Sequence, residues 1–336
     1  MMDVIWSNPY KYCESRGINQ LWEMMALWFG DDEGSFYNFD DIDKNRQITH
    51  VWLPGSLAIK LNDAKFKVPA KQQNELRILS ADIALMPSKR HNNDAASIFV
   101  NSMVSGRGGR CMNNIMYTQN YEGELTDSMA LIIRKCFDEF NCDYIVLDVK
   151  GPGLGVFDAL VKDMVDPETG EIYPALSCCN DDVYASRCKV YGAAKAIWVI
   201  NGSARLNSEC AIHLRDCFRG GRVRLPVSEY DAEQILSDIR GYSARSPEEK
   251  MRMQLPYINT TLLINELINL QHDDSSGYVR VSEKANMRKD RYSSLSYNLY
   301  VASQLERELS KPKNAVPDSS FFVFRQPRQA DKGKRR

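Results

Sequence analysis

Three aspartates in distant parts of the chain have a local sequence that suits metal chemistry. Asp82 interrupts an apolar stretch, LRILSADIALM, and Asp148 ends a continuous apolar run, YIVLD. Asp290 lies in the first turn of a segment with helical periodicity, RKDRYSSLSYNLYVASQLE. A carboxylate is costly to desolvate unless hydrogen bonds or a cation neutralise it. Carboxylates from two strands and one helix suit an oxygen-ligand site for Mg²⁺ or Mn²⁺.

Each of these signals has an ordinary alternative. The glycine-rich turn that follows Asp148, GPGLG, is also typical of a simple joint between a strand and a helix. Asp273 and Asp274 compete with Asp290 as a third ligand, although HDDSSG is typical of a loop after a helix. A zinc site is disfavoured because no C-x-x-C pair occurs among the best candidates, which are Cys178, Cys179, Cys188, Cys210, His213 and Cys217.

Charge restricts how the chain could contact nucleic acid. With 43 Lys and Arg against 44 Asp and Glu, the formal net charge is −1, so overall attraction to DNA is absent and contacts must come from local patches. The patch on either side of Asp290 carries most weight. The candidate DNA contacts are Lys150, Lys289, Arg291, Arg107 and Arg110.

The elements that must position the acids follow a regular order. Three strands over about 76–86, 95–104 and 110–121 are joined by short turns, which predicts an antiparallel meander. A helix from Thr126 then leads to the strand that ends at Asp148. A crossover helix of this length implies a strand parallel to the first and next to it. Asp82 and Asp148 are therefore expected side by side.

The rest of the chain gives broader expectations. Residues 1–70 are interpreted as a linker or as the docking edge of a missing neighbour, and the absence of a complete P-loop motif indicates that the chain carries no complete P-loop ATPase. Residues 71–310 would form the main α/β domain, with an insertion within about 165–275. The basic tail 311–336 is expected to be disordered. Nine cysteines without a paired framework and no secretion signal favour a reducing cytoplasm, and no apolar run is long enough to span a membrane.

The ordered set of motifs resembles the C-terminal nuclease domain of tailed-phage large terminase subunits, within the ribonuclease H-like superfamily. The resembling residues are LRILSADIAL, YIVLDVKGPGLGVFDAL, LPYINTTLLINELINL and RKDRYSSLSYNLYVASQLE, which together run from about residue 76 to 309. The resemblance implies a mixed sheet, an antiparallel three-strand meander plus parallel strands, flanked by helices. It also implies Asp82, Asp148 and Asp290 as catalytic acids that hold two divalent ions, Mg²⁺ or Mn²⁺.

The same resemblance implies a function and partners. The chain would be an endodeoxyribonuclease that cleaves double-stranded concatemeric viral DNA during genome packaging, by two-metal hydrolysis of phosphodiesters. Partners would be the small terminase subunit, the portal protein and a packaging ATPase domain that this chain lacks. The isolated chain would be a monomer that is oligomeric in the motor. It would act in the host cytoplasm, docked transiently on the procapsid portal, and would not remain in the mature virion.

Two rival functions stay open. Another ribonuclease H-like nuclease, such as a junction resolvase or a transposase-like enzyme, would prefer branched substrates or join strands. A non-catalytic docking module would use the acids only structurally, to bridge motor and portal. The sequence does not determine the phage and its packaging strategy, the preferred ion or the cleavage-site preference.

Overall fold

The structure is a computed structural model that describes residues 35–83, 95–106, 110–283 and 289–310. Its framework is an eight-stranded mixed sheet with the order β1-β10-β4-β3-β2-β5-β9-β8. The strands are β1 Arg46–Ile48, β2 Glu75–Asp82, β3 Ala95–Ser105, β4 Cys111–Glu122, β5 Tyr144–Asp148, β8 Leu176–Cys178, β9 Ala194–Ile200 and β10 Val223–Pro226.

The directions of the central strands match the expected fold. β2, β3 and β4 pair antiparallel, whereas β5 pairs parallel with β2, and β9 pairs parallel with β5. An antiparallel meander followed by two parallel strands is the ribonuclease H-like arrangement, so the predicted fold class is confirmed. β10 and β1 extend the sheet beyond β4 by parallel pairing, which the sequence did not predict.

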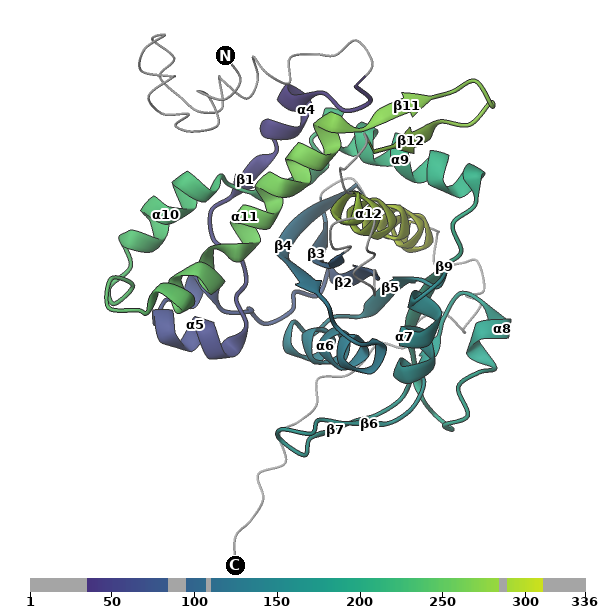
Figure 1. The fold of residues 1–336 in the computed structure, drawn as a ribbon, viewed down its shortest axis with the longest axis horizontal. Helices are drawn as coiled ribbons and strands as arrows, with labels where there is room; N and C mark the ends of the chain where they lie inside the picture. The colour runs from purple at the N-terminus through teal and green to yellow at the C-terminus, as the bar shows by residue number, and fades with distance from the viewer. Residues whose placement is uncertain (1–34, 84–94, 107–109, 284–288, 311–336) are drawn as a thin grey trace, which may run out of the picture.

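Helices cover both faces of this sheet (Figure 1). Two small hairpins, β6 Met164–Val165 with β7 Ile172–Tyr173 and β11 Gln271–Asp273 with β12 Arg280–Ser282, lie outside it. The helices are α4 Phe39–Asp43, α5 Gly55–Leu61, the 3₁₀ helix η1 Ala64–Phe66, α6 Thr126–Glu139, α7 Gly153–Leu160, α8 Asp182–Ala185, α9 Ala204–Arg219, α10 Glu229–Ser237, α11 Pro247–Asn269 and α12 Asp290–Leu309.

Alternation along the central strands divides the core into two layers. On β2, Leu79 and Ala81 pack in one cluster with the apolar faces of α6 and α7. Ile78 points the other way and packs with Val301 of α12, and Ser80 bonds to Ser294 of the same helix. Because successive side chains of a strand point to opposite faces, this period continues to the strand end and directs Asp82 toward α12.

Part of the segment that was expected to be a linker packs into the domain. β1 is the edge strand of the main sheet, beside β10. Val51, Leu53 and Phe66 are fully buried in a cluster with residues of α10 and α11. Residues 35–70 are thus part of the fold. The expected tail, 311–336, lies outside the described residues, and the division into segments 1–70, 71–310 and 311–336 stays a prediction.

Some expected elements differ in their bounds. The glycine-rich turn GPGLG is shorter than expected, because helix α7 already begins at Gly153, and it ends at Leu160. Part of HDDSSG, which was expected to be a loop, is a strand: His272 and Asp273 belong to β11, which pairs with β12 to form a hairpin. None of the helices in the described part of the chain is long and apolar enough to cross a membrane.

Candidate metal centre

The sheet brings Asp82 and Asp148 to neighbouring positions. β2 and β5 are parallel neighbours, and Ala81 pairs with Leu147, so each aspartate is the next residue on its strand. The alternation on β5 matches that on β2: Leu147 packs with α6, and Val146 packs with α12. Both acids therefore end parallel strands at one edge of the sheet and point to the same face.

Helix α12 supplies the third acid from that face. Buried polar contacts fix the helix across β2, because Ser80 Oγ lies 3.1 Å from Ser294 Oγ, and Asn298 Nδ2 donates to Ser80 Oγ at 3.1 Å. Asp290 is the first residue of this helix. The hydroxyl of Ser293, one turn further on, hydrogen bonds to the Asp82 carboxylate. The first turn of α12 is thus held against the end of β2.

Electrostatics disfavour the charged form of Asp82. Burial of its carboxylate, together with repulsion from Asp290 and Asp148, raises the pKa of Asp82 to about 7. Hydrogen bonds from the Ser293 hydroxyl and the Ile83 backbone N–H oppose this rise but do not cancel it. Asp148 and Asp290 are therefore both close enough to Asp82 to repel it.

The carboxylate of Asp148 has neighbours that favour its charged form. Burial raises the pKa of its carboxyl. The backbone N–H and the charge of Lys150, and a hydrogen bond from the Tyr297 hydroxyl, lower this pKa but do not cancel the rise. The Lys150 N–H donates to Asp148 Oδ1 at 2.9 Å. The turn after Asp148 requires a glycine, because a Cβ on Gly153 would lie 1.8 Å from the Asp148 carbonyl oxygen. This close packing places the start of α7 directly behind the acid.

The donor set fits a hard divalent cation. The three side chains offer only carboxylate oxygens, the ligands that Mg²⁺ and Mn²⁺ prefer, and their mutual repulsion would be relieved by a positive ion. All three residues are partly buried, so each keeps some access to solvent. Within the described ranges, no group of three or more His, Cys, Asp or Glu side chains is already arranged to hold a metal ion. Asp148 and Asp290 thus lie near Asp82 without forming a closed ligand cluster with it.

The predicted DNA contacts are distributed unevenly around the acids. Lys150 Nζ donates to the Gly202 carbonyl, beside Asp148. Lys289 precedes Asp290 and pairs with Glu283 at 2.7 Å. Arg291 is buried in an ion pair with Glu266 at 2.6 Å, so its guanidinium does not face solvent.

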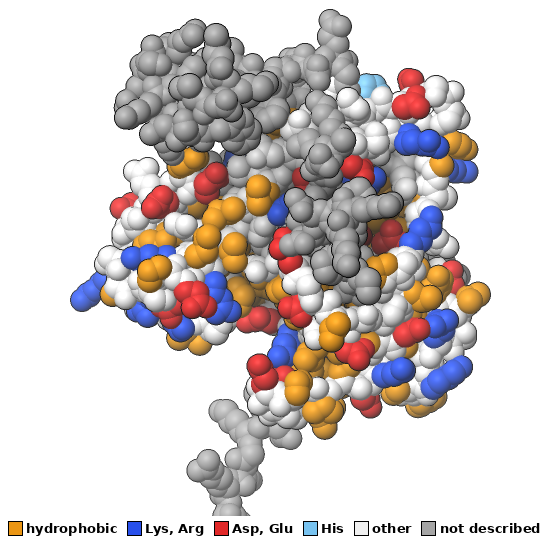
Figure 2. All heavy atoms as spheres, in the orientation of Figure 1, with side chains coloured by type: hydrophobic (Ala, Val, Ile, Leu, Met, Phe, Trp, Pro, Cys, Tyr) orange, Lys and Arg blue, Asp and Glu red, His pale blue; other side chains and the backbone are white. Residues whose placement is uncertain are grey.

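Arg110 lies far from the acids. It precedes the pair formed by Cys111 and Ser105, whereas Asp82 pairs with Ser97 at the other end of β3. At about 3.3 Å per residue, this separation is roughly 25 Å. Arg107 lies outside the described residues. On the face shown in Figure 2, basic side chains are scattered at the periphery among acidic ones.

The two rivals for the third ligand, Asp273 and Asp274, are both exposed. Asp273 is exposed in β11, and its carboxylate accepts from the Ser275 backbone N–H at 2.9 Å. A small cavity of about 90 Å³ does adjoin the acids, since its lining includes Ser293 and Tyr297, which contact Asp82 and Asp148, and also Lys289.

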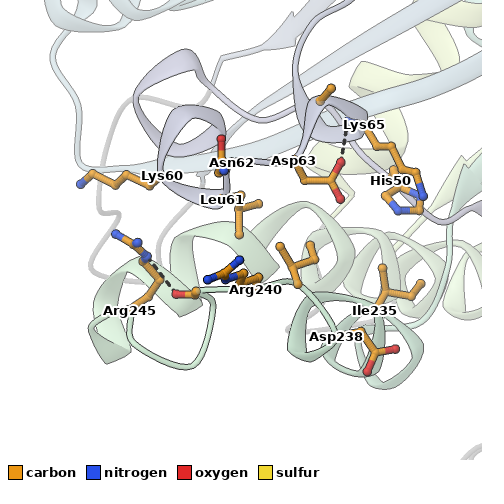
Figure 3. A pocket seen from close by; sticks show the side chains of 13 residues that line it. His50, Lys60, Leu61, Asn62, Asp63, Lys65, Ile235, Asp238, Arg240 and Arg245 are labelled. Atoms are coloured by element: carbon orange, nitrogen blue, oxygen red, sulfur yellow. Dashed lines mark hydrogen bonds between the residues drawn. The ribbon is translucent and has the colours of Figure 1, made fainter.

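A larger cavity, of about 810 Å³, lies elsewhere (Figure 3). Its walls come from the end of α5 with the residues that follow, and from the end of α10 with the loop after it. None of the three aspartates lines it. Basic and acidic groups are mixed in the lining, which includes His50, Lys60, Asp63, Lys65, Asp238, Arg240 and Arg245.

Three residues around the acids were not predicted: Glu266, Ser293 and Tyr297. The Tyr297 hydroxyl lies within hydrogen-bond reach of Asp148 and 3.1 Å from Asn207 Oδ1. Ser293 and Tyr297 follow Asp290 at three and seven positions, which puts all three near one face of a helix. That spacing could have identified them. Glu266 lies in another helix and has no comparable signal.

Comparisons with known proteins were made with the sequence and with the structure. No protein-family model matches the chain, and no curated protein matches it. Among solved structures, it is similar to the large terminase nuclease of thermophilic phage G20c with bound cobalt, at 12% identity and a TM-score of 0.40, over 80% of this chain and 97% of that one.

Two further similar structures are the nuclease domain of the large terminase subunit gp2 of bacterial virus Sf6 and the large terminase of bacteriophage HK97. The Sf6 domain has 11% identity and a TM-score of 0.38, over 81% of this chain and 97% of that one. The HK97 protein has 9% identity and a TM-score of 0.40, over 80% of this chain and 43% of that one. The kind of protein that the sequence motifs resemble is the kind found among similar structures.

Proposed function

We propose that this chain is a metal-dependent endonuclease that hydrolyses phosphodiesters of duplex DNA during packaging of a phage genome. One observation carries the proposal. Asp82 and Asp148 end adjacent parallel strands on the face covered by α12, whose first residue is Asp290, and repulsion among these acids contributes to a pKa of about 7 for Asp82. Because a cation would relieve this repulsion, the three acids are suited to bind one.

The proposed metal ligands are Asp82, Asp148 and Asp290, around two Mg²⁺ or Mn²⁺ ions. When bound, such ions lower the pKa of a water nucleophile and stabilise charge on the scissile phosphate and the leaving oxygen. Asp82 has Asp148 and Asp290 as its charged neighbours, so it is our candidate to contact both ions. Ser293 would orient Asp82 by donating from its hydroxyl, and the Lys150 N–H would orient Asp148.

Contacts to the DNA backbone would come from Lys150 and Lys289, which lie within two residues of Asp148 and Asp290 in the sequence. Phosphate contacts carry no base information, so we expect weak sequence preference and an affinity that falls steeply with salt. Site choice would then depend on partners of the packaging motor, for which we propose the small terminase subunit, the portal protein and a packaging ATPase.

Plasmid cleavage with Mn²⁺ tests the proposal. Asp82→Asn and Asp148→Asn should each lower the cleavage rate by at least about 1000-fold, because several kcal/mol of transition-state stabilisation depend on the ions. Asp273→Asn is the matched control: it makes the same change at the exposed rival acid and should keep wild-type cleavage. Circular dichroism would check that each variant is folded.

The outcomes separate the alternatives. Unchanged cleavage in Asp82→Asn or Asp148→Asn would exclude that residue from the reaction. If folded wild-type protein cleaves no duplex at any Mn²⁺ concentration but binds a portal complex, the docking module is favoured. Preference for four-way junctions over linear duplex would favour a resolvase.

A further inference from the structure

A buried ion pair joins α11 to the start of α12. Arg291 Nη1 lies 2.6 Å from Glu266 Oε1, and the two residues are only 8% and 7% exposed. Arg291 Nη2 also lies 3.5 Å from Asn259 Oδ1, which is about two turns before Glu266 on α11. This pair lies directly beside the proposed metal ligand Asp290, which precedes Arg291.

The same carboxylate also binds the backbone of α12. Glu266 Oε2 accepts from the Tyr292 N–H at 3.1 Å, while Oε1 accepts from Arg291. The first N–H groups of a helix have no partner within the helix, so a carboxylate that accepts from one of them stabilises the first turn. Glu266 therefore holds the two residues that follow Asp290, one through its side chain and one through its backbone.

These contacts of Glu266 oppose the repulsion between Asp290 and Asp82. Lys289, the residue at the N-cap of α12, provides no capping hydrogen bond from its side chain. Asp290 faces Asp82, and like charges favour a displaced or frayed first turn. The contact of Ser293 with Asp82 holds the turn from the sheet side, and Glu266 holds it from the α11 side.

We propose that Glu266 is a positioning residue that keeps Asp290 directed at Asp82 and Asp148, through Arg291 and the Tyr292 N–H. The inference rests on the proposed metal site. It also gives Arg291 a role different from the DNA contact that the sequence suggested. A simple packing role for the ion pair would affect stability alone, whereas a positioning role must also change the affinity for the ion.

The test measures Mn²⁺ binding to the full chain, by loss of the free-ion electron paramagnetic resonance signal. Glu266→Gln keeps the size of the side chain but loses its charge, and its amide nitrogen cannot accept, so either Arg291 or the Tyr292 N–H loses its acceptor. We expect its Mn²⁺ dissociation constant to rise about tenfold, as is usual when a group that orients a ligand is changed.

Glu75→Gln is the matched control. Glu75 forms an equally short buried pair with Arg77, at 2.6 Å, at the opposite end of β2 from Asp82. Both variants should lower the melting temperature of the metal-free protein, but Glu75→Gln should bind Mn²⁺ like wild type. The double variant Glu266→Leu/Arg291→Met removes both charges, a change that buried pairs often tolerate. It should fold and still bind Mn²⁺ about tenfold more weakly.

Three outcomes decide the inference. Wild-type Mn²⁺ affinity in both folded Glu266 variants would overturn it, and so would an equal loss of affinity in Glu75→Gln. If Asp82→Asn binds Mn²⁺ as tightly as wild type, the proposed metal site itself fails, which is a different result from failure of the positioning role.

Discussion

The two ends of strand β2 hold charge in opposite ways. At the start, Arg77 and Glu75 are buried, and Glu75 accepts from Arg77 at 2.6 Å, Ser102 at 2.8 Å and the Gln72 N–H at 2.9 Å. Burial raises the pKa of Glu75, but these hydrogen bonds outweigh it and hold the pKa below its usual value. At the other end, burial and neighbouring acids raise the pKa of Asp82 to about 7.

On a single strand, this difference distinguishes an ion pair that stabilises the fold from an acid for which we propose a function. At the start of β2, every charged group has a partner of opposite sign, and Arg77 also donates to the carbonyls of Phe140 and Pro69. At the end, two further acids approach Asp82, and its hydrogen bonds do not offset them. An arrangement that is unfavourable for the protein alone becomes favourable when a cation binds, so the strained end is where we expect function.

The largest expected change in stability is at the start of β2, where Glu75 and Arg77 form an ion pair. Arg77→Leu would leave Glu75 buried without its cation, which costs about 3–5 kcal/mol of the free energy of unfolding. Urea unfolding would measure the loss. Cleavage per folded molecule should stay near the wild-type value, because Arg77 lies at the opposite end of β2. Loss of cleavage in the folded fraction would show that the two ends are not independent.

At the Asp82 end of β2, we expect a substitution to raise the stability of the metal-free protein, by a smaller amount. The pKa of Asp82 is raised from 3.8 to about 7 in the folded state. The contribution of Asp82 to the stability of the metal-free protein is therefore fully present below about pH 4 and is lost as the pH rises through 7. Asp82→Asn cannot ionise, so it should be more stable than wild type at pH 8, by at least about 1 kcal/mol.

Thermal melts at pH 5 and pH 8 in EDTA would measure this difference. The gain of Asp82→Asn over wild type should shrink at pH 5, where wild-type Asp82 is mostly protonated. Addition of Mn²⁺ should raise the melting temperature of wild type and leave that of Asp82→Asn nearly unchanged. A variant less stable than wild type at both pH values would contradict the idea of an unneutralised acid.

The smallest effect concerns DNA contacts at the two ends. Lys289 lies beside Asp290, whereas Arg110 lies near the Glu75 end of the sheet. In Ca²⁺ buffers, Lys289→Ala should reduce the salt dependence of duplex binding by about 0.9 in log–log slope, the value for one lost phosphate contact. Arg110→Ala should change it less, because of the distance. An equal reduction in both variants would extend the DNA interface along the whole sheet.

The core of the fold was predictable because its signals are local. The apolar runs of β2 and β5, the short turns of the meander and the length of α6 were enough to predict adjacent parallel strands that carry Asp82 and Asp148. β10 and β1 were not predicted as part of the sheet. Each is only three or four residues long, and its place depends on pairing with strands far away in the sequence. Such short segments carry too little periodicity to be assigned.

For the proposed site, the amino-acid sequence alone predicted the three acids and the two strands and the helix that carry them, since apolar runs and a helical period can be read locally. Only the tertiary structure decided which face of the sheet both strand acids use, that Ser293 contacts Asp82, and that Glu266 holds the start of α12. It also buried Arg291 and separated Arg110 from the acids. These contacts join residues far apart in the chain, and their partners are chosen by packing between layers, which leaves no periodic trace in either segment.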